Sequence, residues 1–251
     1  MEKRLGDLNY RSTMLKVWQL IVAIAFLYFL VLGSISWGNI LTIIIVHYVL
    51  YLVGLEIGYH KLLSHRSFST TEWIKNTLVA VGSLLSHPPV LQWVDLHRKH
   101  HGNSDKPKDP HSPWHPKRGL ISYLFSTDLP GRTNSYEFKN DRVVQWFDYY
   151  QTHLIWGFSF LLLLIFDPVT VLVWYAVPSL ISPYCLGIAN YVTHQGKYNG
   201  YDYARNWYWI EILAPGMGFH GNHHDTPGTW TLAKKYWWAD TSSIIVKLIK
   251  R

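Results

Sequence analysis

The chain has 251 residues, 49% of them hydrophobic and 16% aromatic, which is enough for one domain, residues 1–251, with a sizeable buried core. Its formal net charge is +7, but the basic residues are scattered among acidic ones without a dense tract. The charge therefore points to a membrane surface and not to nucleic acid as a partner. Cys185 is the only cysteine, which excludes an intramolecular disulfide and a cysteine-rich zinc framework.

The first apolar stretch is uncharged from residue 17 to residue 55 and is interrupted only by a polar turn at residues 33–39. We interpret it as a helical hairpin with spans at about residues 17–36 and 40–58. Each arm has the length that a helix needs to cross hydrocarbon. The segment before it, residues 1–16, is polar, and the absence of a small-residue cleavage site indicates no removable signal peptide.

Two histidines, His60 and His65, follow directly after the second predicted span, in the run HKLLSH. Residues three or four apart share one face of an α-helix, whereas residues five apart do not. We therefore expect the helix to end here, so that the backbone turns the second ring back towards the first.

Residues 76–94 are also uncharged and could cross a membrane, but they contain the run HPP beginning at His87. If they crossed, the histidines before and after them would lie on opposite sides and could not share a metal. We interpret the segment as an interfacial or re-entrant helix. The next histidines, His97, His100 and His101, form an HxxHH box whose spacing aims its rings from one helix face.

A second apolar hairpin is predicted at about residues 149–166 and 169–194, with its break at Asp167 and Pro168. A last histidine box, HGNHH, follows at residues 220–224. The expected fold is all-α and integral to the membrane, with four transmembrane helices in two hairpins.

The predicted topology follows from the distribution of positive charge. Under the four-span arrangement all 23 Lys and Arg residues lie outside the two short hairpin turns. This positive-inside pattern places both termini and the active site on the cytoplasmic side of a multi-pass protein, with residues 59–148 and 195–251 as a helical cap. A mean hydropathy of +0.01 is low for such a protein and leaves open a soluble protein with two buried helical hairpins.

Of the 14 histidines, eight fall into the three boxes. Neutral imidazole is a ligand for iron, copper, nickel and zinc, and eight imidazoles exceed what one ion can use, so two metal ions are expected. The HExxH and ExxH motifs of other metalloproteins are absent. A membrane zinc or iron carrier is the alternative outside enzymes, but carriers need polar groups along their spans, and here the first hairpin offers only His47.

One HxxxxH and two HxxHH boxes together resemble the membrane fatty-acid desaturases. The run NYVTH at residues 190–194 is similar to the NxxxH of their stearoyl-type, acyl-CoA branch, and the run DPH beginning at Asp109 is similar too. The resemblance implies that Asn190 holds a metal-bound water. It also implies two iron ions whose ligands are His60, His65, His97, His100, His101, His194, His220, His223 and His224.

The resemblance further implies an enzyme that uses O₂ and external electrons to introduce a cis double bond, most often at Δ9, into a saturated acyl chain held in a dry, bent tunnel. The electron donor would be ferredoxin or cytochrome b5. Asp95 stands where the acyl-CoA enzymes have an arginine that contacts CoA, so acyl-ACP and glycerolipid acyl chains compete with acyl-CoA as substrate. A membrane hydroxylase or an oxidative decarboxylase of fatty acids or alkanes shares the boxes and remains the alternative.

Carboxylates that orient the histidines are expected near the boxes. The candidates are Glu56, Asp95, Asp109, Glu211 and Asp225. The remaining histidines match no ligand position of the family, namely His47, His87, His111, His115 and His153.

Overall fold

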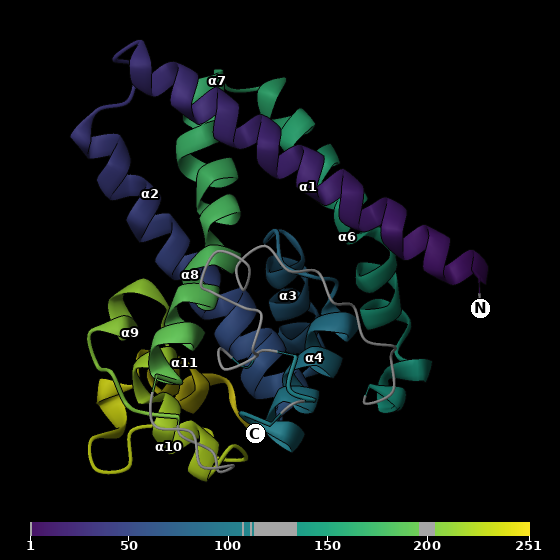
Figure 1. Ribbon diagram of the computed structural model, residues 1–251, viewed down its shortest axis with the longest axis vertical. Coiled ribbons are helices and arrows are strands. Elements are labelled where there is room, and N and C mark those ends of the chain that lie inside the picture. The colour runs from purple at the N-terminus through teal and green to yellow at the C-terminus, as the bar shows by residue number, and fades with distance from the viewer. Residues whose placement is uncertain (1, 107, 111, 113–134, 196–203) are drawn as a thin grey trace.

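The computed structural model describes residues 2–106, 108–110, 112, 135–195 and 204–251, and all of its regular elements in these ranges are helical (Figure 1). The all-α prediction is therefore confirmed for the described part of the chain. The predicted non-ligands His111 and His115 lie outside the described residues.

The first two helices are α1 (Glu2–Val31) and α2 (Trp37–Leu50), which diverge from a tight turn at one end of the molecule (Figure 1). Gly33 makes this turn with φ +70°, a conformation that favours glycine. Ser36 then caps α2, since its hydroxyl accepts the Asn39 amide at 3.2 Å. The predicted polar turn thus separates two helices.

α2 continues without a break into the π-helix η1 (Tyr51–Ser64). The next helix, α3 (Glu72–Ser83), packs against η1. The two backbones approach so closely at Gly54 that a Cβ atom there would lie 2.6 Å from the amide nitrogen of Gly82. With 12 residues, α3 is shorter than the roughly 20 residues of a transmembrane helix. It is followed by α4 (Val90–Asn103).

The second half begins with the short η2 (Tyr136–Asn140) and the long α6 (Arg142–Leu163), beside α1. α7 (Pro168–Val171), the π-turn η3 (Leu172–Ala176) and α8 (Val177–Thr193) then form one continuous helical rod. α8 packs against α2, and the ring of His194 at its C-terminal end lies 5.0 Å from the ring of His100 on α4.

The C-terminal part, coloured yellow-green to yellow in Figure 1, lies at the end of the molecule opposite the α1–α2 turn. Its elements are α9 (Ile210–Leu213), η4 (Met217–Phe219), α10 (His220–Asp225), η5 (Trp237–Ala239) and α11 (Thr241–Ile249). α11 packs against η1, which brings the last residues of the chain next to the first histidine box.

Three helices in the described ranges are long and apolar enough to cross a membrane: Tyr10–Val31, Trp37–Ser64 and Pro168–Thr193. Their outward faces are apolar, as on α1, where Leu20, Ile24 and Leu27 are 58–60% exposed. Such surfaces suit lipid better than water. The third predicted span, residues 149–166, falls on α6, which is not among these three helices.

Candidate metal centre

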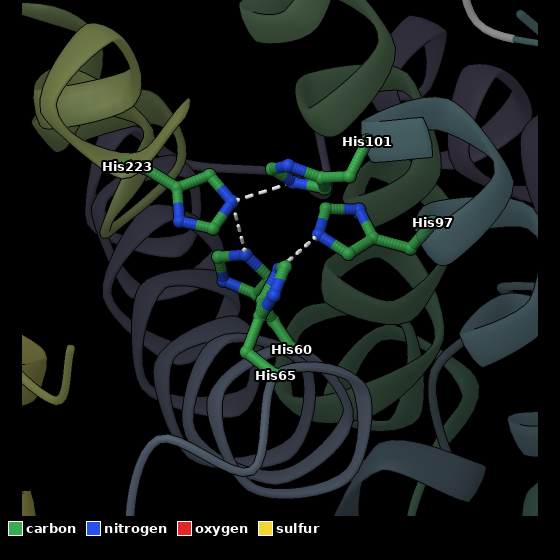
Figure 2. Close-up of side chains that lie close together, drawn as sticks. All are labelled: His60, His65, His97, His101 and His223. Atoms are coloured by element: carbon green, nitrogen blue, oxygen red, sulfur yellow. Dashed lines mark hydrogen bonds between the residues drawn. The ribbon is translucent and has the colours of Figure 1, made fainter. Parts of the chain in front are cut away.

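The predicted ligands come together in two adjoining groups of histidines. Within each group the ligand nitrogens lie within 4.8 Å of one another. The first group is His60, His65, His97, His101 and His223, and Figure 2 shows their rings pointing towards one another. The second group is His100, His194, His220 and His224. Residues from η1, α4, α8 and α10, which are far apart in the chain, thus meet at one place.

The π-helical winding of η1 aligns the first histidine box. The amide of His65 donates to the carbonyl of His60 at 3.1 Å, an i to i+5 bond that places residues five apart in adjacent turns. The two rings lie 4.9 Å apart. His65 caps the C-terminus of η1, so the predicted helix end is confirmed. The wide winding of that helix was not expected.

Each HxxHH box is divided between the two groups. On α4, His97 and His101 are one turn apart and belong to the first group, whereas His100 turns towards the second. On α10 the division is reversed, with His223 in the first group and the pair His220 and His224 in the second. Each HxxHH box therefore contributes histidines to both groups.

The rings converge through one type of atom, Nε2. In the first group His223 Nε2 lies 3.0 Å from His60 Nε2 and 2.8 Å from His101 Nε2. In the second, His220 Nε2 lies 2.9 Å from His194 Nε2 and 3.1 Å from His224 Nε2. Lone pairs directed at a common centre are the arrangement that a metal ion requires.

The protonation of these rings also suits a metal. Burial, reinforced by the neighbouring imidazoles, holds the pKa of His97, His220, His223 and His224 well below the usual value. The same causes lower the pKa of His65 to about 2. Neutral imidazole is the form that binds a metal ion.

Carboxylates hold three of the rings from the opposite side, through Nδ1. Glu56 lies 2.7 Å from His60 Nδ1, and Asp109 lies 2.9 Å from His100 Nδ1. Both contacts agree with the candidates from the sequence. A third carboxylate, Asp105, lies 3.0 Å from His194 Nδ1 and was missed. Asp105 stands four residues after His101, and this closeness to a box was the one signal in the sequence for its role. Its partner His194 is 89 residues away in the chain, so the contact itself could not be read from the sequence.

For the other three candidate carboxylates, no hydrogen bond found within the described ranges leads to a ligand ring. Asp225 instead pairs with Lys234 at 2.7 Å on the surface. Glu211 accepts the amides of Gly216 and Gly218, and Asp95 is buried on α4. Three of the predicted non-ligands are among the described residues and lie outside both groups: His47 binds the carbonyl of Leu213, His87 binds the hydroxyl of Ser182, and His153 is exposed on α6.

The sequence profile of the fatty acid desaturase family matches residues 35–238, which include both histidine groups. The chain belongs to the fatty acid desaturase family. This desaturase, an oxidoreductase, is thus a membrane protein whose clustered histidines are compatible with a metal site.

Curated relatives of the desaturase are distant but cover most of it. An sn-1 stearoyl-lipid 9-desaturase of Anabaena variabilis is 28% identical over 87% of this chain and 83% of its own length. An sn-2 palmitoyl-lipid 9-desaturase of Nostoc sp. (strain 36) is 28% identical over 81% and 75%. Delta-9 acyl-lipid desaturase 1 of Arabidopsis thaliana is 27% identical over 79% and 68%.

A cavity of about 810 Å³ opens beside the desaturase's two histidine groups. His60, His97, His100 and His220 line one part of it, together with Asn190. The cavity continues between α1 and α8, where mostly apolar side chains line it: Leu15, Leu20, Ala23, Leu180, Ile181 and Leu186. Such a cavity can hold an apolar chain next to the metal site.

Proposed function

We propose that this desaturase introduces a cis Δ9 double bond into saturated acyl chains of membrane glycerolipids, with O₂ as co-substrate and ferredoxin or cytochrome b5 as electron donor. The relatives support the position and the acyl carrier, because their names describe 9-desaturases of lipid-bound chains. Asp95, in the place of a CoA-binding arginine, supports a carrier other than CoA.

The proposed metal centre contains two iron ions, one in each histidine group. His60, His65, His97, His101 and His223 would hold the first ion, and His100, His194, His220 and His224 the second. Asn190, which lines the cavity beside the second group, would hold a water on that ion. The observation that carries the proposal is the convergence of Nε2 atoms in both groups. Iron supplies the O₂-dependent removal of hydrogen from unactivated methylene groups, which no side chain can perform.

The protein's own contribution is to hold the acyl chain in place beside the metal site and to exclude water. The apolar stretch between α1 and α8 would hold the chain, and the histidine-lined part would receive the carbons that react. Burial of His100, His194 and His220 at 0–2% exposure keeps bulk water away from the second group.

The proposed topology is one domain with four spans, in which α6 supplies the third. Its apolar half, residues 149–163, would cross with the help of its neighbours α1 and α7. Both termini and the metal centre would lie on the cytoplasmic side, where the positive charge of the chain is concentrated.

Expression in a host that lacks Δ9 desaturation tests the proposal, with wild type, His100→Ala and the control His153→Ala. Gas chromatography of each lipid class should reveal new Δ9 acids on glycerolipids for wild type and His153→Ala, and none for His100→Ala. Metal analysis of the purified wild type should give about two iron ions per chain. Hydroxy acids or one-carbon-shorter alkenes without unsaturated acids would instead indicate a hydroxylase or a decarboxylase, and new double bonds confined to acyl-ACP or acyl-CoA would refute the carrier.

A further inference from the structure

Three charged side chains are buried together behind the first histidine box. Glu56, Lys61 and Asp240 are 2%, 1% and 0% exposed. Lys61 Nζ lies 2.8 Å from Asp240 Oδ2 and 3.7 Å from Glu56 Oε1, and it also donates to the carbonyl of Trp230 at 3.1 Å. Buried charges are costly unless they are paired, so these residues form one electrostatic unit.

This unit of three charged residues contacts the proposed metal ligand His60. Glu56 uses Oε2 to bind His60 Nδ1 at 2.7 Å, and its other oxygen faces Lys61. Within the described ranges Glu56 Oε1 accepts no hydrogen bond, so the ammonium of Lys61 is the cation that faces it. A continuous series of contacts thus runs from Asp240 through Lys61 and Glu56 to His60.

The π-winding of η1 creates this series. Glu56, His60 and Lys61 occupy positions i, i+4 and i+5 of one π-helix, so both later residues lie in the turn next to Glu56. Gly216, in the left-handed conformation with φ +89°, covers the carboxylate so closely that a side chain there would overlap with it. The close backbone at Gly216 and the two partners His60 and Lys61 therefore fix the position of the Glu56 carboxylate.

A second acid next to this unit does not compete for Lys61. Glu211 binds the amides of Gly216 and Gly218, and burial, with the charges of Asp240 and Glu56, raises its pKa to about 8. Near neutral pH it is mostly uncharged, which leaves Lys61 opposite two carboxylates, Glu56 and Asp240.

We propose that Lys61 and Asp240 are positioning residues for the metal centre: they fix Glu56 in the place from which it orients the ring of His60. The segment that carries Asp240 thereby contributes to metal binding, although it supplies no ligand. A carboxylate on Nδ1 directs the Nε2 lone pair at the metal, and loss of such a partner typically weakens metal binding about 10- to 100-fold. The inference rests on the proposed function, because it requires that His60 binds metal.

The test measures Fe²⁺ affinity of the purified full chain under anaerobic conditions, by competition with a chromogenic chelator. Glu56→Gln and Lys61→Met should each bind Fe²⁺ about 10- to 100-fold more weakly than wild type. The double variant Glu56→Gln/Lys61→Met should bind no more weakly than Glu56→Gln alone, because Lys61 acts through Glu56. Lys61→Arg should restore most of the affinity.

Lys75→Met is the matched control, since it breaks a partly buried pair with Asp141 at 2.5 Å that is remote from the histidines. Its Fe²⁺ affinity should equal that of wild type. If Lys61→Met does not fold, Lys61→Met/Asp240→Asn removes both charges together and should fold with the same weakened affinity.

Two results would overturn the inference alone: wild-type affinity in a folded Lys61→Met or Lys61→Met/Asp240→Asn chain, or losses in Glu56→Gln and Lys61→Met that multiply in the double variant. Absence of Fe²⁺ binding by the wild type would instead refute the proposed function, and the inference with it.

Discussion

His194 Nδ1 lies 3.0 Å from the carboxylate of Asp105, and this contact fastens the end of α8 to the segment that follows α4. Asp105 has φ +58°, and its amide donates to Asp109 Oδ2 at 2.9 Å, while Asp109 in turn binds His100. One short stretch after the second box therefore orients two rings of the second histidine group.

Replacement of Asp105 by Asn should weaken metal binding in the second group about 10- to 100-fold, because His194 loses its charged partner. Asn tolerates the left-handed backbone, so the fold should persist. Metal analysis after mild chelation should find close to one iron ion per chain, with wild type retaining two. Asp225→Asn is the control, since that exposed carboxylate pairs with Lys234 on the surface. Full metal loading of Asp105→Asn would contradict the prediction.

A methyl group on Gly54 should destabilise the protein. It would lie 2.6 Å from the amide nitrogen of Gly82 and force η1 away from α3. We expect Gly54→Ala to cost about 1–3 kcal/mol, which thermal denaturation in detergent would register as a lower Tm. Gly157→Ala on α6, where nothing lies within 4 Å of the new carbon, should leave Tm unchanged or raise it. Equal melting temperatures for both variants would speak against the close packing.

Narrowing the cavity should shorten the acyl chain that the desaturase accepts. Arg11, Lys16 and Ala23 of α1 all line the cavity. Ala23 lies inside the predicted span, whereas Arg11 and Lys16 precede it. Ala23→Phe should shift the products to shorter monounsaturated acids than those of wild type, as measured by gas chromatography. Ile24→Phe is the control, because Ile24 is 58% exposed on the outer face. An unchanged product distribution in Ala23→Phe would place the acyl chain elsewhere.

Stability should fall in acid through Asp240. Burial alone would raise the pKa of this carboxyl, but Lys61 and the hydroxyls of Ser242 and Ser243 lower it below the usual value. The unfolded chain then binds this proton more tightly than the folded one. The stabilisation that the ionised Asp240 carboxylate gives to the folded state is complete above the unfolded-state pKa of about 3.9. This stabilisation is lost as the pH falls towards the folded-state pKa. Asp240→Asn should have a lower Tm than wild type at pH 7. Between pH 5 and pH 3 its Tm should fall by less than that of wild type. An equal fall in both proteins would rule out Asp240 as the source of the acid sensitivity.

The nine histidines predicted from the sequence are those that the structure gathers in the two groups, because the spacing within one HxxxxH and two HxxHH boxes and the NxxxH run is a local property of the chain. The sequence also located the polar turn at residues 33–39 between the first two helices. The winding of η1 could not be predicted, since the spacing of its polar residues Glu56, His60 and Lys61 does not by itself distinguish i to i+4 from i to i+5 hydrogen bonding. The contacts of Asp105 with His194 and of Asp240 with Lys61 join residues 89 and 179 positions apart, which only the folded packing brings together.

Each histidine group takes at least one member from α10: His223 in the first, and His220 and His224 in the second. Before the ribosome has made that helix, the nascent chain holds an incomplete set of donors for either of the two proposed ions. Maturation of the centre must therefore wait until nearly all of the 251 residues have been synthesised and the upstream helices have been inserted. A stop codon between residues 195 and 219 would leave all three long apolar helices in place and remove members of both histidine groups.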